Sequence, residues 1–237
     1  MKAGWQTKTL GDLCEFQRGL TYAKGDEVES SSTVVLRANN INLTSNLIDL
    51  SELRCISDKV VVPHNKKVKK GSLIVCTASG SKSHLGKVAY IDKEYGYAFG
   101  GFMGMITPKK GLVSRYLFHL MTSDTYKSFI GELADGANIN NLRFEDLKNF
   151  LVPHPEPLEQ QRIVGILDEV FEAIATAKAN AEKNLYNARV LFDGYLHAIF
   201  AQNDADWAEK PLRDFAQLVS TGPFGSLLHS SDYVSDG

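Results

Sequence analysis

Along the first 150 residues, short apolar runs alternate with polar stretches that contain glycine, asparagine or proline. Four of these runs are rich in β-branched or other apolar residues and end in turn residues, which is typical of β-strands. The glycine- and aromatic-rich stretch GYAFGGFMG at 96–104 predicts a tight hairpin in the core. The predicted strands are TVVLR at 33–37, SLIVCT at 72–77, GKVAYI at 86–91 and FMGMITP at 102–108.

Apolar residues at helical spacing predict three helices in the same region. In TLGDLCEF, Leu10, Leu13 and Phe16 fall on one helical face, and Gly19 can end this helix. In NLRFEDLKNF, Asn141 is suited to the N-cap position. The predicted helices cover residues 9–16, 113–134 and 141–150.

The stretch LVPHPEP at 151–157 predicts an extended exit, because proline can neither continue a helix nor pair in a central strand. We therefore place a domain boundary after residue 152. The strands and helices before it predict one α/β (α+β) domain over residues 1–152.

After this exit the chain is predicted to form one long helix, within residues 153–202, about 60 Å in length. Positions spaced alternately by three and four residues from Leu167 are nearly all apolar, which is the seam of a coiled coil. The polar Asn184 would fix its register. A lone helix with an apolar stripe is unstable in water, so this helix needs a partner. That partner is either a second copy of this chain or the helix that would follow a second domain, and packing on its own domain is the alternative. The predicted seam is Leu167, Val170, Ile174, Ala177, Ala181, Asn184, Ala188, Leu191, Tyr195 and Ala198.

The end of the chain repeats its beginning. The pattern W-x-x-K-x-L-x-D occurs at 5–12 and again at 207–214, so every matching pair is offset by 207 − 5 = 202 residues. This predicts a protein built from two repeats, with residues 203–237 opening the second; the alternative is a chance match. The matching pairs are Trp5 with Trp207, Lys8 with Lys210, Leu10 with Leu212, and Asp12 with Asp214.

Composition places the chain among soluble globular proteins. Hydrophobic residues make up 43% and aromatic residues 10%, and no apolar run approaches the roughly 20 residues of a membrane span. The N-terminus has no signal-peptide pattern. Cys14, Cys55 and Cys76 are odd in number and far apart, which indicates a reducing compartment, the cytoplasm. The six histidines show no metal-ligand spacing.

The net charge of −2 conceals an asymmetry. Residues 1–150 carry 20 Lys and Arg against 15 Asp and Glu, a balance of +5. Residues 151–237 carry 6 against 13, a balance of −7. A basic half joined to an acidic half indicates two different kinds of partner, and the acidic half suits proteins.

The stretch PEPLEQQRIVGILDEV at 155–170 resembles the conserved region of the specificity subunit of type I restriction–modification systems. In that family it opens the long helix after each target recognition domain. The resemblance spans nearly the whole chain but departs in length, because a full member would carry a complete second recognition domain and a second long helix. We interpret the chain as a truncated product or a fragment of such a subunit. Also similar to the family are LRANNINL at 36–43, residues 69–91, GANINNLRFEDLKNFLVPHPEP at 136–157 and STGPFGSLLHSSDYV at 220–234.

The resemblance implies a protein that binds double-stranded DNA and has no catalytic activity or cofactor of its own. Each recognition domain reads one half of a bipartite site, and paired helices space the two domains. Adenine methylation with S-adenosylmethionine would belong to modification subunits, and ATP- and Mg-dependent cleavage to a restriction (motor nuclease) subunit. A half-length chain would form a homodimer on a palindromic site. The expected interface with the modification subunits is Glu159, Gln160, Gln161 and Arg162.

Reading bases requires donors and acceptors on loops. Arg37 suits guanine and the neighbouring asparagines suit adenine, whereas the lysine run at 66–70 supplies salt-dependent phosphate contacts. Ordinary loop, turn and helix-cap roles are the alternatives for these side chains. The candidate DNA-binding residues are Tyr22, Lys24, Arg37, Asn39, Asn40, Asn42, Lys66, Lys67, Lys69, Lys70, Thr77, Ser79, Ser81, Lys82, Ser83, His84, Asn138, Asn140 and Asn141.

Two other functions stay open from the sequence: a DNA methyltransferase or nuclease fragment with its own recognition domain, and a coiled-coil scaffold unrelated to DNA. Against an enzyme, GSKSHLGKV at 80–88 misses the phosphate-loop pattern. Five residues rather than four separate Gly80 from Gly86, and Val88 occupies the position of the metal-binding hydroxyl. The chain also lacks the Asp/Asn-Pro-Pro-Tyr/Phe motif of amino-methyltransferases.

Overall fold

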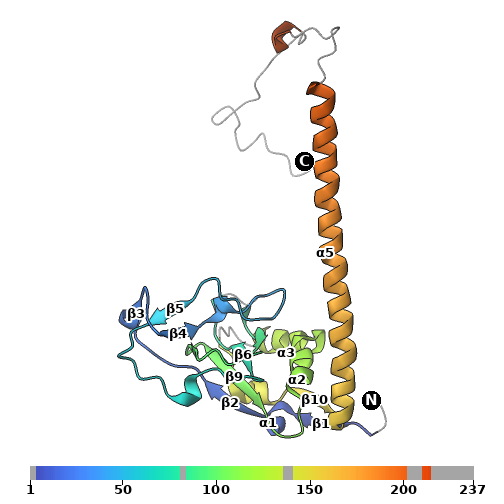
Figure 1. Cartoon of the computed structure of the whole chain (residues 1–237). Coiled ribbons are helices and arrows are strands. Elements are labelled where there is room, and N and C mark those ends of the chain that lie inside the picture. The colour runs from blue at the N-terminus through green and yellow to red at the C-terminus, as the bar shows by residue number, and fades with distance from the viewer. Residues whose placement is uncertain (1–3, 81–83, 136–140, 202–209, 215–237) are drawn as a thin grey trace, which may run out of the picture. The chain divides into compact units, whose positions relative to one another are not determined.

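The structure, a computed structural model, describes residues 4–80, 84–135, 141–201 and 210–214. The chain divides into two compact units, Met1–Ile174 and Ala175–Gly237. The first unit is a mixed α/β head, as the sequence predicts (Figure 1). The helix α5 (Pro157–Ala201) begins in this head and continues into the second unit.

The described residues of the head form three sheets, and the four predicted strands are confirmed as β4, β6, β7 and β9. An antiparallel sheet has the order β2 (Cys14–Arg18), β9 (Met103–Pro108), β6 (Leu73–Cys76) and β7 (Val88–Tyr90). A second sheet, in which β4 and β8 are parallel, has the order β3 (Glu27–Val28), β5 (Arg54–Ile56), β4 (Thr33–Leu36) and β8 (Ala98–Phe99). A two-stranded pair joins β1 (Gln6–Thr9) to β10 (Leu151–His154).

The core has layers on both sides of β6, which explains why this strand is apolar throughout. Leu73 and Val75 belong to the cluster that packs under the helices, whereas Ile74 and Cys76 belong to the cluster shared with the second sheet. Successive side chains of a strand point to opposite faces, so a strand between two layers is buried at every position. Figure 1 shows β6 and β9 between the second sheet and the helices α2 (Ser114–Thr122) and α3 (Asp124–Asp135).

The first predicted helix is wrong beyond Leu13. Helix α1 covers only Leu10–Leu13, capped by Thr9 and Asp12, whose side chains hydrogen-bond each other at 2.7 Å. From Cys14 the backbone is extended because β2 pairs along its whole length with β9. Tertiary strand pairing therefore overrides the helical spacing of Phe16.

The predicted helix over 113–134 is two helices, α2 and α3, that divide at Ser123. The backbone N–H and the hydroxyl of Ser123 both donate to the carbonyl oxygen of Leu120 and close α2, while the same hydroxyl accepts from Tyr126 N. The third helix, α4 (Phe144–Lys148), is shorter than predicted, and its N-cap is Arg143 rather than Asn141. Asn141 instead forms an isolated bridge with Ala78.

The stretch GYAFGGFMG is not the predicted hairpin. Strand β8 belongs to the second sheet and β9 to the first, so the turn at 100–103 carries the chain from one sheet to the other. A backbone hydrogen bond from Met103 N to Gly100 O closes this turn at 2.8 Å. Residues 19 and 20 run beside it, since Gly19 N donates to Met103 O and Leu20 N donates to Phe99 O.

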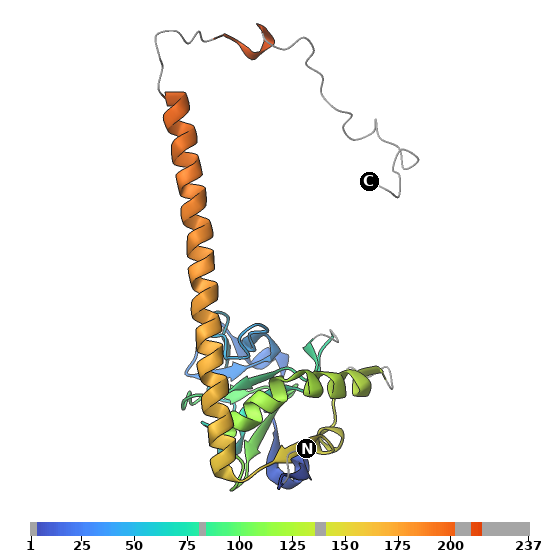
Figure 2. The ribbon, with the colours of Figure 1, turned by 90° about the vertical axis from the view of Figure 1, so that its right-hand side faces the viewer.

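The extended exit is present as predicted, and β10 leads directly into α5. The first turns of α5 pack on α2, which continues the head as far as Ile174 (Figure 2). Asp168 accepts from Arg115 at 2.6 Å and lies 2.9 Å from His119 Nε2, and Phe171 stacks on the His119 ring at 5.6 Å. Burial lowers the pKa of His119 despite the neighbouring Asp168 carboxylate.

Along the rest of α5 every described side chain is exposed, including the predicted seam from Ile174 onward. Apolar side chains outside the seam are exposed there as well, by 43% to 67%, so the apolar surface is wider than one stripe. Within the described part of the chain, no helix is both long and apolar enough to cross a membrane. The exposed apolar residues outside the seam include Leu185, Tyr186, Val190, Phe192, Leu196 and Ile199.

Candidate nucleic-acid interface

Four stretches that border strands of both large sheets enclose a recess of about 490 Å3. They are residues 20–27 after β2, 37–39 after β4, 78–79 after β6 and the turn 100–103 between β8 and β9. Because these stretches meet at one place, the recess combines predicted residues that lie far apart in the sequence. The predicted DNA-binding residues that line it are Tyr22, Lys24, Arg37, Asn39 and Ser79.

Arg37 is the most informative side chain of the recess. It is half-buried, and its Nε atom is buried without a hydrogen-bond partner among the described residues. Tyr22 also lines the recess, and its hydroxyl donates to Glu27 Oε1 at 3.5 Å. Burial is the main cause that raises the pKa of Tyr22, and the Glu27 carboxylate raises it further. Arg37 lines the recess, and its guanidinium carries several donors, so the residue is suited to a ligand that supplies acceptors.

The wall formed by the turn 100–103 is rigid. A Cβ atom on Gly19 would collide with the carbonyl group of Gly100, so only glycine permits this approach of the two backbones. The carbonyl oxygen of Phe102 accepts three hydrogen bonds, from Thr77 N, Thr77 Oγ1 and Ala78 N. The backbone of Phe102 is therefore fixed, whereas 71% of the residue is exposed at the edge of the recess.

Two predicted DNA contacts are structural instead. Asn40 is 1% exposed, and its amide nitrogen donates to the carbonyl oxygens of Asp49 and Glu52 at 2.9 Å. Thr77 is 6% exposed, and its hydroxyl is the one that holds Phe102. Each of these polar side chains is buried and satisfied by backbone groups, so it supports the recess without lining it.

Asn42 and Asn141 lie outside the lining of the recess. The side chain of Asn42 accepts from Thr44 N and Ser45 N, which is the turn role that was its alternative. Asn141 is exposed and bridges to Ala78, one residue from the recess-lining Ser79. His84 is half-buried and does not line the recess either. Ser81, Lys82, Ser83, Asn138 and Asn140 lie outside the described residues.

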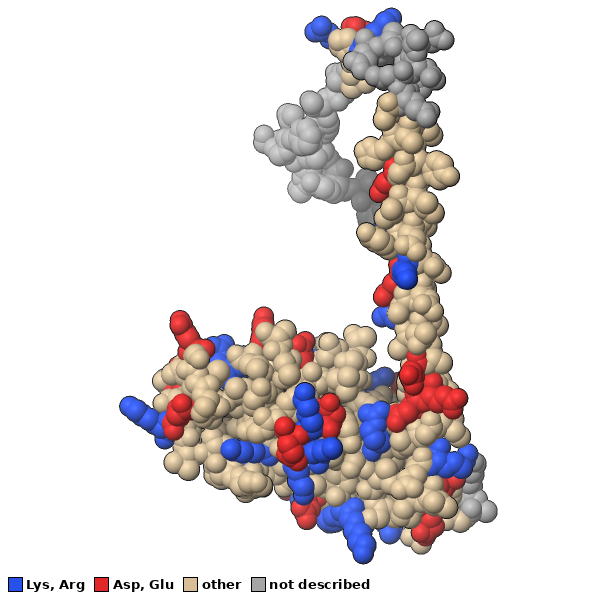
Figure 3. Space-filling model, in the orientation of Figure 1, with Lys and Arg blue, Asp and Glu red and all other residues tan. Residues whose placement is uncertain are grey.

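The lysine run is not brought to the recess. The Nζ of Lys66 donates to the carbonyl oxygen of Arg18 at 2.9 Å, and Lys67 and Lys69 line a different cavity of about 630 Å3 with Glu15 and Glu94. Lys70 is exposed. Figure 3 shows that Lys and Arg are interspersed with Asp and Glu on the face of the head that it displays. Phosphate contacts by the run stay a prediction, separate from the recess.

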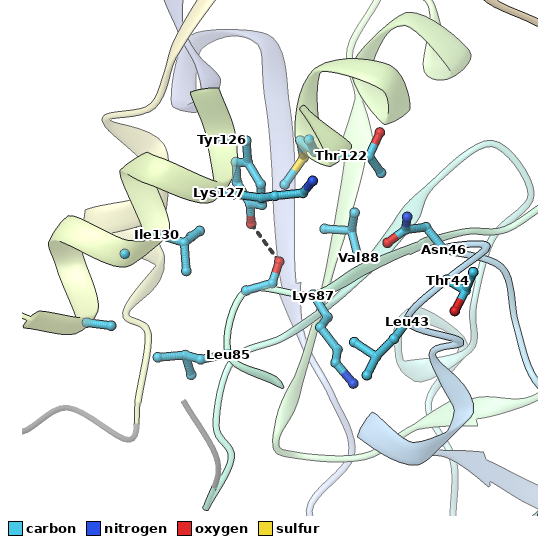
Figure 4. A pocket seen from close by; sticks show the side chains of 14 residues that line it. Leu43, Thr44, Asn46, Leu85, Lys87, Val88, Thr122, Tyr126, Lys127 and Ile130 are labelled. Carbon is cyan, nitrogen blue, oxygen red and sulfur yellow. Dashed lines mark hydrogen bonds between the residues drawn. The ribbon is translucent and has the colours of Figure 1, made fainter. Parts of the chain in front are cut away.

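A further cavity of about 480 Å3 lies between the loop at 43–46, residues 85–88 and helices α2 and α3 (Figure 4). Its walls are largely apolar, and the hydroxyl of Tyr126 already donates to Gly86 O. The amines of Lys87 and Lys127 are its charged groups, and Lys127 pairs with Asp124 at 2.9 Å. None of the predicted DNA-binding residues lines it, so it is the weaker candidate for reading DNA.

The expected partner interface at the start of α5 needs one correction. Gln160 is fully buried: its side chain accepts from Val113 N at 2.8 Å and donates to Gly111 O and Pro155 O. Its buried side chain therefore joins α5 to the head. Gln161 and Arg162 are exposed, and Arg162 pairs with the half-buried Glu159 at 2.6 Å.

The described residues contain no group of three or more His, Cys, Asp or Glu side chains placed to hold a metal ion. Burial raises the pKa of Cys14 to about 12, and burial also raises the pKa of Cys76. Buried thiols of this kind are protonated and unreactive. The recess instead combines hydrogen-bonding groups of an arginine and an asparagine with an exposed aromatic ring, which are groups that bind a ligand without reacting with it.

A family model described as the type I restriction modification DNA specificity domain matches residues 2–184. The chain belongs to this family. The match covers the recess and α5 as far as residue 184, so the recess and this part of the helix belong to a DNA specificity domain.

Curated relatives of this specificity domain include two enterobacterial proteins. The chain is 30% identical over 183 residues to the type I restriction enzyme StySPI specificity subunit of Salmonella potsdam, covering 76% of this chain and 39% of the relative. It is 29% identical over 183 residues to the EcoKI specificity subunit of Escherichia coli K12, with the same coverage. The chain therefore spans about two fifths of the length of these relatives.

Solved structures share the fold of this specificity domain. The HsdS subunit from Thermoanaerobacter tengcongensis matches with a TM-score of 0.56 at 18% identity, over 75% of this chain and 40% of that one. A chain from a study of complex assembly and conformational transition of the type I R-M system matches with a TM-score of 0.61 at 19% identity, over 80% and 44%.

Proposed function

We propose that this chain is a DNA specificity subunit of a type I restriction–modification complex that reads one half of a bipartite DNA site. The observation that carries the proposal is the family match over residues 2–184. The recess supports it, because it gathers side chains of the types that read base edges. We propose that the head over residues 1–152 is the target recognition domain, that residues 153–202 are its exit and spacer helix, and that residues 203–237 open a second recognition domain.

In this proposal the recess residues divide their roles by chemistry. Arg37 donates to a base edge, since its guanidinium carries several donors in one plane and prefers guanine. Asn39 is exposed beside it and suits adenine, and the exposed Lys24 contacts phosphate. Sequence choice then comes from Arg37 and Asn39, and salt-dependent affinity from Lys24 and the other lysines.

The proposed partners are double-stranded DNA, modification (methyltransferase) subunits and a restriction (motor nuclease) subunit in the cytoplasm. Methyl transfer from S-adenosylmethionine and ATP-dependent cleavage would belong to those subunits. Helix α5 carries six Asp and Glu against four Lys and Arg, and this slight acidic excess favours protein over DNA contacts along it. The exposed Gln161, with Arg162 and Glu159, remains the proposed contact at the start of the helix.

The function is tested by co-producing the chain with a modification subunit and mapping methylated adenines in the host DNA. We expect a single bipartite motif. Substituting Arg37→Met in the same complex should weaken binding to that motif about 10- to 100-fold, because a lost bidentate contact costs about 1–3 kcal/mol. Binding is measured by fluorescence anisotropy at a fixed salt concentration.

Lys59→Met is the control for Arg37→Met, because Lys59 is exposed and does not line the recess. It should weaken binding by less than threefold, within the small effect of one phosphate charge. Methylation by the purified chain with S-adenosylmethionine and no second protein would contradict the proposal. Equal binding of motif and scrambled DNA by the wild-type complex would contradict it too.

We also propose that α5 pairs with α5 of a second copy through the predicted seam. Ala181 lies in this seam, whereas Ala179 lies two residues away on another face, and both are exposed. Ala181→Glu should raise the dimer dissociation constant at least about tenfold, because it places two charges at the packed contact, whereas Ala179→Glu should leave it unchanged. Sedimentation velocity at several concentrations measures this. A compact wild-type monomer would contradict the pairing.

A further inference from the structure

Phe102 carries an exposed ring on a backbone that is fixed by hydrogen bonds. Three hydrogen bonds to its carbonyl oxygen and the turn bond from Met103 N to Gly100 O leave the backbone little freedom. A single exposed apolar residue is common on protein surfaces and alone carries no argument. Phe102 differs because it borders the recess that Arg37, Tyr22 and Asn39 also line.

The recess therefore combines two requirements of one kind of ligand. An aromatic face attracts a flat apolar ring by stacking, and Arg37 with Tyr22 and Asn39 supplies polar groups at the edge of that ring. A nucleobase has such a flat face with donors and acceptors at its edge. A volume of about 490 Å3 is in the range of small-molecule pockets and admits one base.

We propose that the recess takes one nucleobase that has left the DNA stack, with Phe102 stacking on its face and Arg37 donating to its edge. This inference rests on the proposed function and adds one requirement to it: the half-site is read with one nucleotide unstacked rather than as an undistorted duplex. The favourable contact with Phe102 offsets part of the cost of unstacking.

The test uses the complex of the full chain with its modification subunit and duplexes of the mapped motif. 2-Aminopurine replaces the bases of the half-site one position at a time, because its fluorescence rises when it leaves the stack. A methyltransferase unstacks its own target base, so the mapped methylated adenines are left out of this readout. With the wild-type chain, fluorescence should rise at least about threefold at one other position. Phe102→Ala should abolish this rise and weaken binding about 10-fold, in line with stacking measured by alanine substitution.

Two further variants separate stacking from simple bulk. Phe102→Trp keeps an aromatic face and should retain binding, whereas Phe102→Leu fills similar space without one and should behave like Phe102→Ala. Val61→Ala is the matched control, since Val61 is 84% exposed and does not line the recess. Unchanged thermal unfolding of each variant shows that the head is folded.

The outcomes distinguish this inference from the function it rests on. If no position other than the methylated adenines shows the rise, or if Phe102→Leu binds like wild type, the stacked base is refuted. In that case a loss of binding by Arg37→Met would leave the proposed function intact. If the wild-type complex neither methylates nor prefers a motif, the proposed function fails and the stacked base fails with it.

Discussion

Replacing Gly19 with alanine is expected to lower the free energy of unfolding of the head by about 4 kcal/mol. The added Cβ would collide with the backbone carbonyl of Gly100 and lie 2.6 Å from the carbonyl oxygen of Phe99. Neither is a side chain that can rotate away, so the turn 100–103 must move. That movement would break the bonds from Gly19 N to Met103 O and from Leu20 N to Phe99 O. Urea denaturation followed by circular dichroism measures the loss.

Gly25 provides the control for Gly19→Ala. Gly25 is exposed, and a Cβ atom added to it would meet nothing within 4 Å. Gly25→Ala should therefore change the free energy of unfolding by less than about 0.5 kcal/mol. If the two alanine variants unfold at the same urea concentration, the close approach of the two backbones is not what holds the turn.

Substituting Gln160→Met is expected to lower the free energy of unfolding of the head by about 3 kcal/mol. Methionine preserves most of the volume but leaves Val113 N, Gly111 O and Pro155 O without their partner. Each buried backbone group that loses its hydrogen bond costs about 1–3 kcal/mol, less where water can enter. The same denaturation experiment gives the value.

Gln161→Met, one residue further along, separates this role from any general effect of methionine on the helix. Gln161 is exposed, so its substitution should change the free energy of unfolding by no more than about 0.5 kcal/mol. Equal losses for the two variants would mean that Gln160 does not join α5 to the head.

The strands that lie in the core could be predicted from the sequence because their apolar runs are buried on both faces. Strand β6 is the clearest case, since each of its four side chains is fully buried. The strand after Leu13 could not be predicted, because β2 pairs with β9, about 90 positions away in the sequence. The local spacing of apolar residues gives no sign of such a distant pairing. The division between α2 and α3 at Ser123 is not predicted, because apolar residues keep their helical spacing across it.

Five of the predicted residues line the candidate site, but residue type does not predict which polar side chains are buried. The sequence does not distinguish polar side chains that contact a ligand from those that support the fold. Only the structure shows that backbone groups use the hydrogen-bonding atoms of Asn40, Thr77 and Gln160. Phe102 was overlooked for the opposite reason. An aromatic residue between glycines and apolar residues predicts a core position, and its exposure depends on a turn between two sheets.

The distal turns of α5 carry water-exposed Leu, Val, Ile, Phe and Tyr side chains around much of the helix circumference. A two-stranded coiled coil buries only one apolar stripe of each helix, so pairing with one identical helix would leave other apolar side chains exposed to water. When this chain is present in excess over the proteins that cover this surface, the excess should aggregate. The concentration of those proteins would then limit how much of the chain stays in solution.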